Sequence, residues 1–327
     1  MKILFHENEL NYRGTSIAMY DYADFNEKYL GNESVIIYDK TCKTNHPLGI
    51  EKFKNRFQVL EYTNFNEVDS LIRKNNIDLL YAIKNGDKDG VESTECKTVV
   101  HSVFKHFEPH GDVYAYVSQW LADEMTQSKY PFVPHMVNFT DETNEDLRKQ
   151  LDIPKNAKVF GYYGGAKSFN ITFAQKTIEE IAKKHKDYFF IFMGVTSFVK
   201  EKWWKSNLNN IIFLKPSADI LQKLKFINTC NALLHARERG ETFGITVAEF
   251  ALKNKPIITF AYSPEKAHIM ELKSEAYYYR NQNELQDIIL DSDLKLSALE
   301  NYKKFLPHSV MNIFKEVFIE DRKQIIV

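Results

Sequence analysis

One stretch of the sequence decides the fold class. It runs ALLHARERGETFGITVAEF from Ala232 to Phe250 and continues, after a short gap, with KPIIT at 255–259. The apolar residues at both ends are typical of buried strands, and the segment 242–252 between them is predicted to be a helix. A strand, a helix and a second strand at this spacing indicate a parallel β-α-β unit, in which ligands bind beyond the carboxyl ends of the strands.

The same alternation extends along the chain in both directions. In the second half, strands are predicted at 159–162, 188–193, 211–214, 232–234 and 256–259, with helices at 173–185, 219–227 and 242–252. In the first half, strands are predicted at 2–5, 34–38, 77–83 and 97–100, with helices at about 15–30, around 68–72 and from 119. The predicted N-caps are Thr15, Ser118, Ser217 and Ser309.

The length and the prolines predict two domains. A chain of 327 residues holds about two domains of roughly 100–200 residues each. The segment 131–157 carries three prolines and a charged run, 141–149, that could form one polar helix, so it is predicted to connect the domains. The first domain is therefore placed at 1–145 and the second at 156–305. A final helix follows at 306–327, with apolar residues spaced as a wide buried stripe.

The charge balance argues against a nucleic-acid-binding protein. Lys and Arg total 43 against 44 Asp and Glu, so the chain as a whole lacks the basic footprint of a polyanion-binding protein. Residues 1–150 carry 17 basic and 24 acidic side chains, whereas residues 151–327 carry 26 and 20. This asymmetry fits a small anion bound by the second domain, and it equally fits an uneven surface charge.

The sequence shows no pattern of a transmembrane segment, a signal peptide or a cysteine motif. No apolar run approaches the roughly 18 residues that span a bilayer. The apolar segment at the start of the chain is too short for a signal peptide, because charged residues follow it directly. We therefore expect a cytoplasmic protein without a transmembrane segment, and peripheral membrane contact stays open. The three cysteines are widely spaced, which predicts neither a disulfide framework nor a zinc site.

Candidate ligand-binding residues surround the start of the predicted helix at 242–252. The backbone amides of Thr242, Phe243 and Gly244 would lie at a helix N-terminus, where unpaired N–H groups and the helix dipole bind anions. Glu241 and Glu249 would be about 12 Å apart along the helix, a separation that suits two ends of one elongated ligand. Carboxylates accept paired hydrogen bonds from vicinal hydroxyls, so a sugar and a ribose joined by phosphates would fit.

These residues carry a resemblance to a known family. Glu241-Thr242-Phe243-Gly244 with Glu249 resembles the E-x7-E signature of retaining nucleotide-sugar glycosyltransferases of the GT-B fold, family 4. The opening strand with the Gly14 loop and the segment 159–167 are similar to the starts of that family's two domains. The resemblance implies an α/β fold of two facing Rossmann-like domains with an interdomain cleft, and a last helix that crosses back to the first domain.

The resemblance also implies roles for individual residues. Glu241 would contact the hydroxyls of the donor sugar, Glu249 would bind the ribose, and the amides at 242–244 would contact the donor phosphate. Lys167 would neutralise the diphosphate leaving group. In the first domain, His101 would lie near the anomeric carbon, as a catalytic residue beside Glu241, and Gly14 would let its loop approach the phosphates.

The sequence departs from the family pattern in its phosphate-binding cations. Only Lys167 follows the strand at 159–162, and the usual Arg is missing there. Arg237 or Arg239 is the hypothetical replacement, and we assign Arg237 to the donor-binding set.

Each assignment has a simpler alternative. Glu249 could be a solvated helix carboxylate, and Glu241 could only complement the helix dipole. His101 could be a core histidine, Lys167 a surface lysine and Gly14 a turn glycine. Asp87 and Asp89 match the D-x-D metal motif of another glycosyltransferase fold, but the sequence offers no further ligands for a hard cation. No metal site and no cofactor besides the donor are predicted.

The function implied by the resemblance is metal-independent transfer of a hexose from a nucleotide diphosphate sugar to an acceptor hydroxyl with retention. Glycan or glycoconjugate synthesis would be its setting. Two alternatives stay open, a catalytically idle sugar-nucleotide-binding protein and a nucleotide-sugar 2-epimerase. The sugar, the base, the acceptor and the oligomeric state are not predicted by the sequence.

Overall fold

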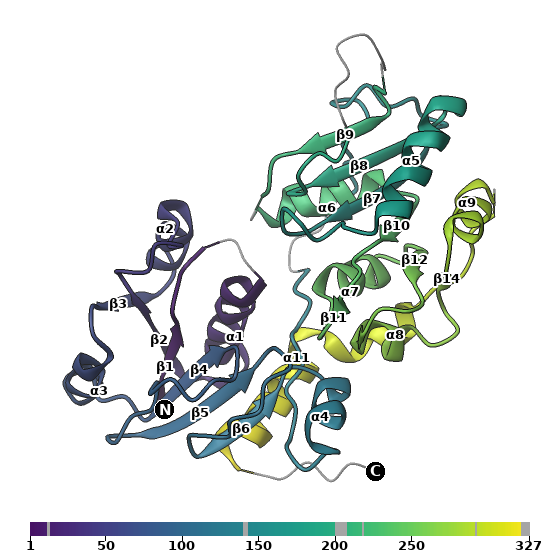
Figure 1. Cartoon of the computed structure of the whole chain (residues 1–327). Helices are drawn as coiled ribbons and strands as arrows, with labels where there is room; N and C mark the ends of the chain where they lie inside the picture. Colours follow the sequence, from purple (N-terminus) through teal and green to yellow (C-terminus); the bar gives the residue numbers. More distant parts are fainter. Residues whose placement is uncertain (12–13, 140–142, 200–207, 218, 292, 322–327) are drawn as a thin grey trace. The chain divides into compact units, whose positions relative to one another are not determined.

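The chain is an α/β protein that divides into two units (Figure 1). The computed structural model describes residues 1–327 except for 12–13, 140–142, 200–207, 218, 292 and 322–327. The first unit combines Met1–Asn138 with Lys304–Val327, and the second is Phe139–Lys303. The chain therefore leaves the first unit at Asn138, before the charged run. Residues 143–149, which could have formed a polar helix, are not helical.

The first unit alternates strands and helices along the chain. Its elements are β1 (Lys2–Glu7), α1 (Gly14–Leu30), β2 (Glu33–Asp39), α2 (Pro47–Lys54), β3 (Gln58–Tyr62), η1 (Phe65–Glu67), α3 (Val68–Asn75), β4 (Leu79–Lys84), β5 (Lys97–Ser102), β6 (Val113–Tyr116), α4 (Gln119–Thr126), α11 (Pro307–Phe314) and η3 (Lys315–Ile319). All neighbouring strands pair in parallel, in the order β3-β2-β1-β4-β5-β6. This is the Rossmann order, and its direction reverses between β1 and β4.

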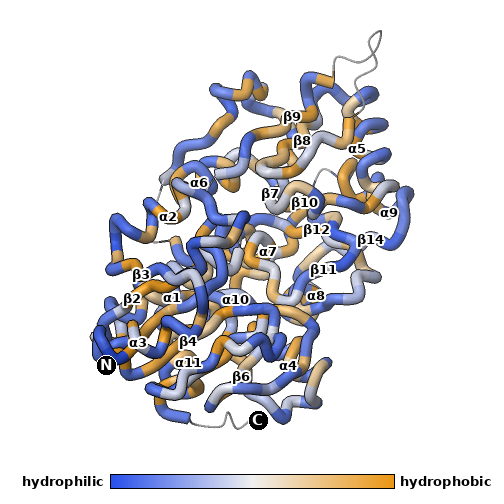
Figure 2. Tube along the Cα trace, turned by 60° about the vertical axis from the view of Figure 1, so that its left-hand side comes forward, coloured by the Kyte–Doolittle hydropathy of each residue, from blue (hydrophilic) through white to orange (hydrophobic). Residues whose placement is uncertain are grey.

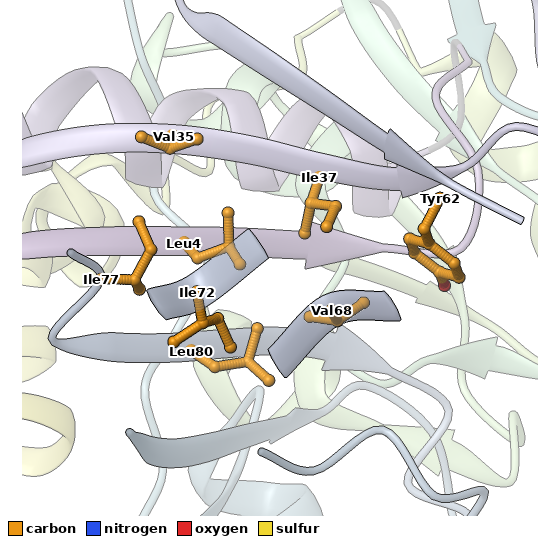
Figure 3. Packing of buried hydrophobic residues seen from close by; sticks show 8 residues of the cluster. All are labelled: Leu4, Val35, Ile37, Tyr62, Val68, Ile72, Ile77 and Leu80. Atoms are coloured by element: carbon orange, nitrogen blue, oxygen red, sulfur yellow. The ribbon is translucent and has the colours of Figure 1, made fainter. Parts of the chain in front are cut away.

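One face of the first sheet packs against α3. Leu4, Val35, Ile37 and Leu80 lie on the strands, and they meet Val68 and Ile72 of α3 together with Tyr62 and Ile77 (Figure 3). Because successive strand residues point to opposite faces, Phe5 lies on the other side of the sheet from Leu4. The continuous apolar runs predicted from the sequence are thus explained by helices on both faces.

The opposite face is covered by α1 and by the end of the chain. Phe314 of α11 stacks on Phe5, with ring centroids 6.3 Å apart, and on Tyr22 of α1 at 5.5 Å. Phe318 of η3 meets Tyr81 of β4 at 5.5 Å. The last helix is therefore part of the core of the first unit.

The second unit repeats the architecture. Its elements are β7 (Lys158–Tyr163), α5 (Thr172–Lys184), β8 (Tyr188–Met193), β9 (Ile211–Leu214), α6 (Ile220–Thr229), β10 (Ala232–His235), β11 (Gly240–Glu241), α7 (Ile245–Leu252), β12 (Ile257–Phe260), β13 (Glu265–Lys266), α8 (Ala267–Leu272), β14 (Tyr277–Tyr279), α9 (Gln282–Leu290) and α10 (Leu299–Tyr302). The short η2 (Lys303–Phe305) leads to α11.

The second sheet is also parallel, in the order β9-β8-β7-β10-β12-β14. This is again the Rossmann order, with the reversal between β7 and β10. Figure 2 shows α7 to be hydrophobic along nearly its whole length, and its residues Val247, Ala248, Phe250 and Ala251 are fully buried. A helix with this few polar residues is enclosed by the protein. The described residues hold no helix that is both long and apolar enough to cross a membrane.

The helix starts were only partly predicted. Ser118 caps α4 as expected, accepting a hydrogen bond from the Leu121 amide at 3.2 Å. Asp219, not Ser217, caps α6. Thr15 lies inside α1 and Ser309 inside α11, which begins with a proline, a residue preorganised for the first helical position.

Truncating Phe314 tests the role of the last helix. We expect Phe314→Ala to lower the free energy of unfolding by about 3–5 kcal/mol, because it removes a buried ring and leaves a cavity. Asn312→Ala, at an exposed position of the same helix, should shift it by less than about 0.5 kcal/mol. Urea unfolding of the two variants makes the comparison, and equal stability would show that α11 is not part of the core.

Candidate functional site

The loops after β7 and β10 lie side by side at the switch point of the second sheet. The amides of Asn170 and Ile171 donate to the Ala236 carbonyl at 3.0 and 3.3 Å, and the Glu238 amide donates to the Asn170 side chain at 2.9 Å. In open parallel sheets, ligands bind outside the carboxyl ends of the strands at such a point. The structure therefore places the loops 164–170 and 236–244, which carry the predicted residues Lys167, Arg237 and Glu241, at one edge.

Two glycines shape the loop after β10. Gly240 has φ +79° and pairs with Glu265 in the short β11–β13 ladder, where a Cβ atom would lie 2.0 Å from the Glu265 carbonyl oxygen. Gly244 has φ +96° and is the N-cap residue of α7. Left-handed backbone at both positions favours glycine, so the GETFG sequence fixes the path of the chain.

The helix α7 begins three residues later than predicted. Its first residue is Ile245, and Thr242 and Phe243 lie in the turn before Gly244. Amides at 242 and 243 therefore belong to a turn, and the first-turn amides belong to Ile245 and its successors. Their contact with a donor phosphate stays a prediction.

Glu241 is held at this edge by two bases. Its Oε2 accepts a hydrogen bond from Arg237 Nη1 at 2.6 Å, and its Oε1 lies 3.2 Å from His235 Nε2. The side chain is 15% exposed. Burial alone would raise the pKa of Glu241, but the hydrogen bond from His235 and the charge of Arg237 outweigh it and lower the pKa to about 2. Glu241 is thus an ionised acceptor at neutral pH.

Two buried histidines behind Glu241 were missed by the sequence analysis. His235 is the last residue of β10, and its Nδ1 lies 2.9 Å from Thr259 Oγ1. The His268 ring is 4.8 Å from the His235 ring, and among the described residues neither of its ring nitrogens finds a hydrogen-bond partner. Burial lowers the pKa of His268 to about 3. The position of His235 at the end of a predicted strand, directly before the loop, could have indicated a site residue. No sequence feature marked His268.

Glu249 is enclosed by its own unit. It is 4% exposed, its Oε1 accepts from Lys223 Nζ, and its Oε2 accepts from the Tyr163 hydroxyl. Burial and the Glu249 charge raise the pKa of Tyr163 well above its usual range. The solvated helix carboxylate considered as an alternative is thus wrong. A ribose contact stays a prediction, and it requires the ribose to share or replace these bonds.

The candidate phosphate-binding cations differ in availability. Arg237 pairs with Glu241, and Arg239 pairs with the buried Glu265 at 2.7 Å. Lys167 lies exposed in the loop after β7, and within the described residues no ion pair to it is found. Lys167 is therefore the cation that needs no exchange of partners to meet an anion.

His101 in the first unit has the surroundings of a core histidine. It is completely buried, its Nδ1 lies 2.7 Å from the Tyr81 hydroxyl, and its Nε2 lies 2.8 Å from the Val133 carbonyl oxygen. Burial lowers the pKa of His101 to about 3. Both ring nitrogens are occupied inside an aromatic cluster, which favours the core-histidine alternative, and the catalytic role of His101 stays a prediction.

The other predicted features of the first unit are less informative. Gly14 is exposed at the first position of α1, and the preceding residues 12–13 lie outside the described residues. Asp89 pairs with the buried Lys84, whereas Asp87 Oδ1 lies 2.9 Å from His106 Nε2. The two D-x-D carboxylates therefore face different bases, and among the described residues no cluster of three metal-ligating side chains occurs.

Comparison with known proteins adds the fold family. No protein-family model and no curated protein sequence matches the chain. Anabaena HepE in complex with UDP-glucose superposes with a TM-score of 0.72 at 16% identity, covering 97% of this chain and 99% of that chain. A glycosyltransferase from Rickettsia africae ESF-5 gives 0.65 at 16% identity, covering 96% and 94%.

A third solved structure belongs to a putative enzyme of the alternative class, the nucleotide-sugar 2-epimerases. A putative UDP-N-acetylglucosamine 2-epimerase from Listeria monocytogenes gives a TM-score of 0.59 at 11% identity, covering 100% of this chain and 99% of that chain. The fold of the chain is therefore the GT-B fold, with two Rossmann-like domains. Both enzyme classes considered from the sequence occur on this fold.

The buried Lys223–Glu249 pair makes a stability prediction. Lys223→Met would leave the Glu249 carboxylate buried without its counterion, and we expect a loss of about 3–5 kcal/mol in the free energy of unfolding. Lys223→Met combined with Glu249→Gln should recover at least half of that loss, because the uncompensated charge is gone. Urea unfolding measures both. A double variant as unstable as the single one would show that the charge is not the cause.

Proposed function

We propose that the protein is a retaining glycosyltransferase that moves a hexose from a nucleotide diphosphate sugar to an acceptor hydroxyl in glycan or glycoconjugate synthesis. The observation that carries the proposal is the ionised Glu241 carboxylate at the switch point of the second sheet, next to the N-cap of α7. A fold shared with a UDP-glucose-bound protein, Anabaena HepE, supports it.

The donor is proposed to lie along the loops after β7 and β10. The hydroxyls of the sugar donate to Glu241, which is acceptor-only when ionised. The diphosphate lies toward the first turn of α7 and Lys167, where backbone amides and a positive charge stabilise it. The Arg237 guanidinium is 30% exposed, so it is free to turn from Glu241 toward the phosphates as the sugar hydroxyls replace it.

The proposed reaction needs no protein nucleophile. The bond between the anomeric carbon and the diphosphate oxygen breaks, and the acceptor oxygen bonds to that carbon on the same face. The acceptor proton passes to the leaving diphosphate. Positive charge from Lys167 and Arg237 stabilises the negative charge that develops on the leaving group. The proposal calls on no metal ion and no cofactor.

A donor panel tests the function. UDP-, GDP- and ADP-sugars are incubated with the protein without acceptor or metal, and the release of nucleoside diphosphate is followed. We expect slow release from one donor. Glu241→Gln should lower that rate about 100-fold, the size of effect seen when one polar group that stabilises a transition state is removed. Glu238→Gln, an exposed neighbour in the same loop, should keep the wild-type rate.

The other outcomes separate the alternatives. Interconversion of two sugar nucleotides without nucleotide release would indicate the epimerase. Binding of a nucleotide with no turnover, even with added glycan acceptors, would indicate an idle binding protein. An unchanged rate in Glu241→Gln would contradict the assignment of the site.

A further inference from the structure

The two partners of Glu241 differ in how firmly they are held. The Arg237 side chain is 30% exposed, so a ligand can replace it at the carboxylate. The His235 side chain is completely buried and reaches the other carboxylate oxygen from the sheet. The orientation of Glu241 therefore depends on His235 whenever Arg237 is displaced.

The sheet itself fixes the His235 ring. His235 and Thr259 are directly opposite one another in the parallel pairing of β10 and β12, and Thr259 is also completely buried. Their side chains meet at 2.9 Å, between His235 Nδ1 and Thr259 Oγ1. The histidine is thus anchored by strand register and not by a loop, and sites built on strands are held more accurately than sites built on loops.

The hydrogen bonds also determine the tautomer. Ionised Glu241 only accepts, so His235 Nε2 must carry the proton that is donated to it. In the neutral ring Nδ1 is then an acceptor, and the Thr259 hydroxyl donates to it. Thr259, His235 and Glu241 form one chain of hydrogen bonds that points toward the carboxylate.

The His235 ring is surrounded by groups from several elements of the second unit. They are Tyr162 from β7 with ring centroids 5.8 Å apart, His268 from α8 at 4.8 Å, and Glu241 with Arg237 from the loop. The Tyr279 hydroxyl from β14 donates to the His235 carbonyl oxygen at 3.0 Å. His268 is neutral, since burial lowers its pKa to about 3, so it brings no positive charge close to the His235 ring.

We propose that His235, oriented by Thr259, is the positioning residue that holds the Glu241 carboxylate for the hydroxyls of the donor sugar. This inference rests on the proposed glycosyl transfer. His235 touches no substrate, and its effect passes through Glu241. Small errors in the position of such a group cost large factors in rate.

Removal of the His235 donor also predicts a change in the pH profile. Burial favours the neutral form of Glu241, and the hydrogen bond from His235 is the first of the effects that oppose it. Without that bond the pKa of Glu241 rises, so the ionised carboxylate that accepts the sugar hydroxyls is lost at a higher pH than in the wild type. The loss of rate should therefore be larger at pH 5 than at pH 8, whereas a general packing defect would lower the rate alike at both.

The test uses four variants of the full chain and the donor found by the panel. His235→Phe removes the donor and keeps a ring, and His235→Gln restores an amide donor near the Nε2 position. Thr259→Val removes the hydroxyl, and Thr259→Ser keeps it. The kcat/KM for nucleotide release is measured between pH 5 and pH 8, and thermal unfolding checks that each variant is folded.

We expect a loss of at least tenfold in His235→Phe at pH 8 and a larger loss at pH 5. His235→Gln and Thr259→Ser should recover most of the rate, and Thr259→Val should lose a smaller factor. The double variant His235→Phe/Thr259→Val should be no slower than His235→Phe, because both residues act through one bond. A folded His235→Phe with the wild-type rate and pH profile, or equal losses in Phe and Gln, would overturn the proposal.

A second measurement separates this inference from the proposed function. The nitrogen-15 NMR shifts of the His235 ring, assigned by their absence in His235→Phe, report its tautomer in the protein without ligand. We expect the proton on Nε2 in the wild type and a loss of that preference in Glu241→Gln. A proton on Nδ1 would overturn the hydrogen-bond chain. The expected tautomer with no turnover of any donor would contradict the glycosyltransferase alone.

Discussion

The candidate site in the second unit is organised around the largely buried negative charge of Glu241. Burial of a carboxylate is costly unless bases and hydrogen bonds compensate it. Two residues supply that compensation for Glu241, Arg237 from the loop after β10 and His235 from the end of β10 itself. The left-handed backbone at Gly240 lets the chain approach β13 closely. This path brings Glu241 close to His235 at the end of β10. The rest of the candidate site depends on this arrangement.

The two carboxylates predicted to bind the ligand, Glu241 and Glu249, differ in exposure and in their partners. Glu241 keeps part of its surface exposed and one exchangeable partner. Glu249 is enclosed, with Lys223 and Tyr163 on its two oxygens. A partly exposed carboxylate can exchange a protein donor for a sugar hydroxyl at little cost, whereas an enclosed one must first give up a buried ion pair. The chemistry proposed for the chain therefore relies on Glu241.

The sequence could predict the fold because its central strands are continuous apolar runs separated by helices. It failed at the edges: β3 reads QVLEY and is half polar, so nothing marked it as a strand. The helix start predicted at Thr242 was wrong because the backbone turns left-handed at Gly244, which is the N-cap of α7. Pairs such as Lys223 with Glu249 join distant segments, and no local pattern indicates which residues will meet in space.

The role of Glu241 at the switch point is tested most directly by a crystal structure of the protein with an intact nucleotide sugar, obtained with the donor that binds most tightly. The account predicts sugar hydroxyls within hydrogen-bond distance of Glu241, a diphosphate at the first turn of α7 beside Lys167, and His235 still bonded to the carboxylate. A donor bound elsewhere, or one whose sugar does not touch Glu241, would contradict it.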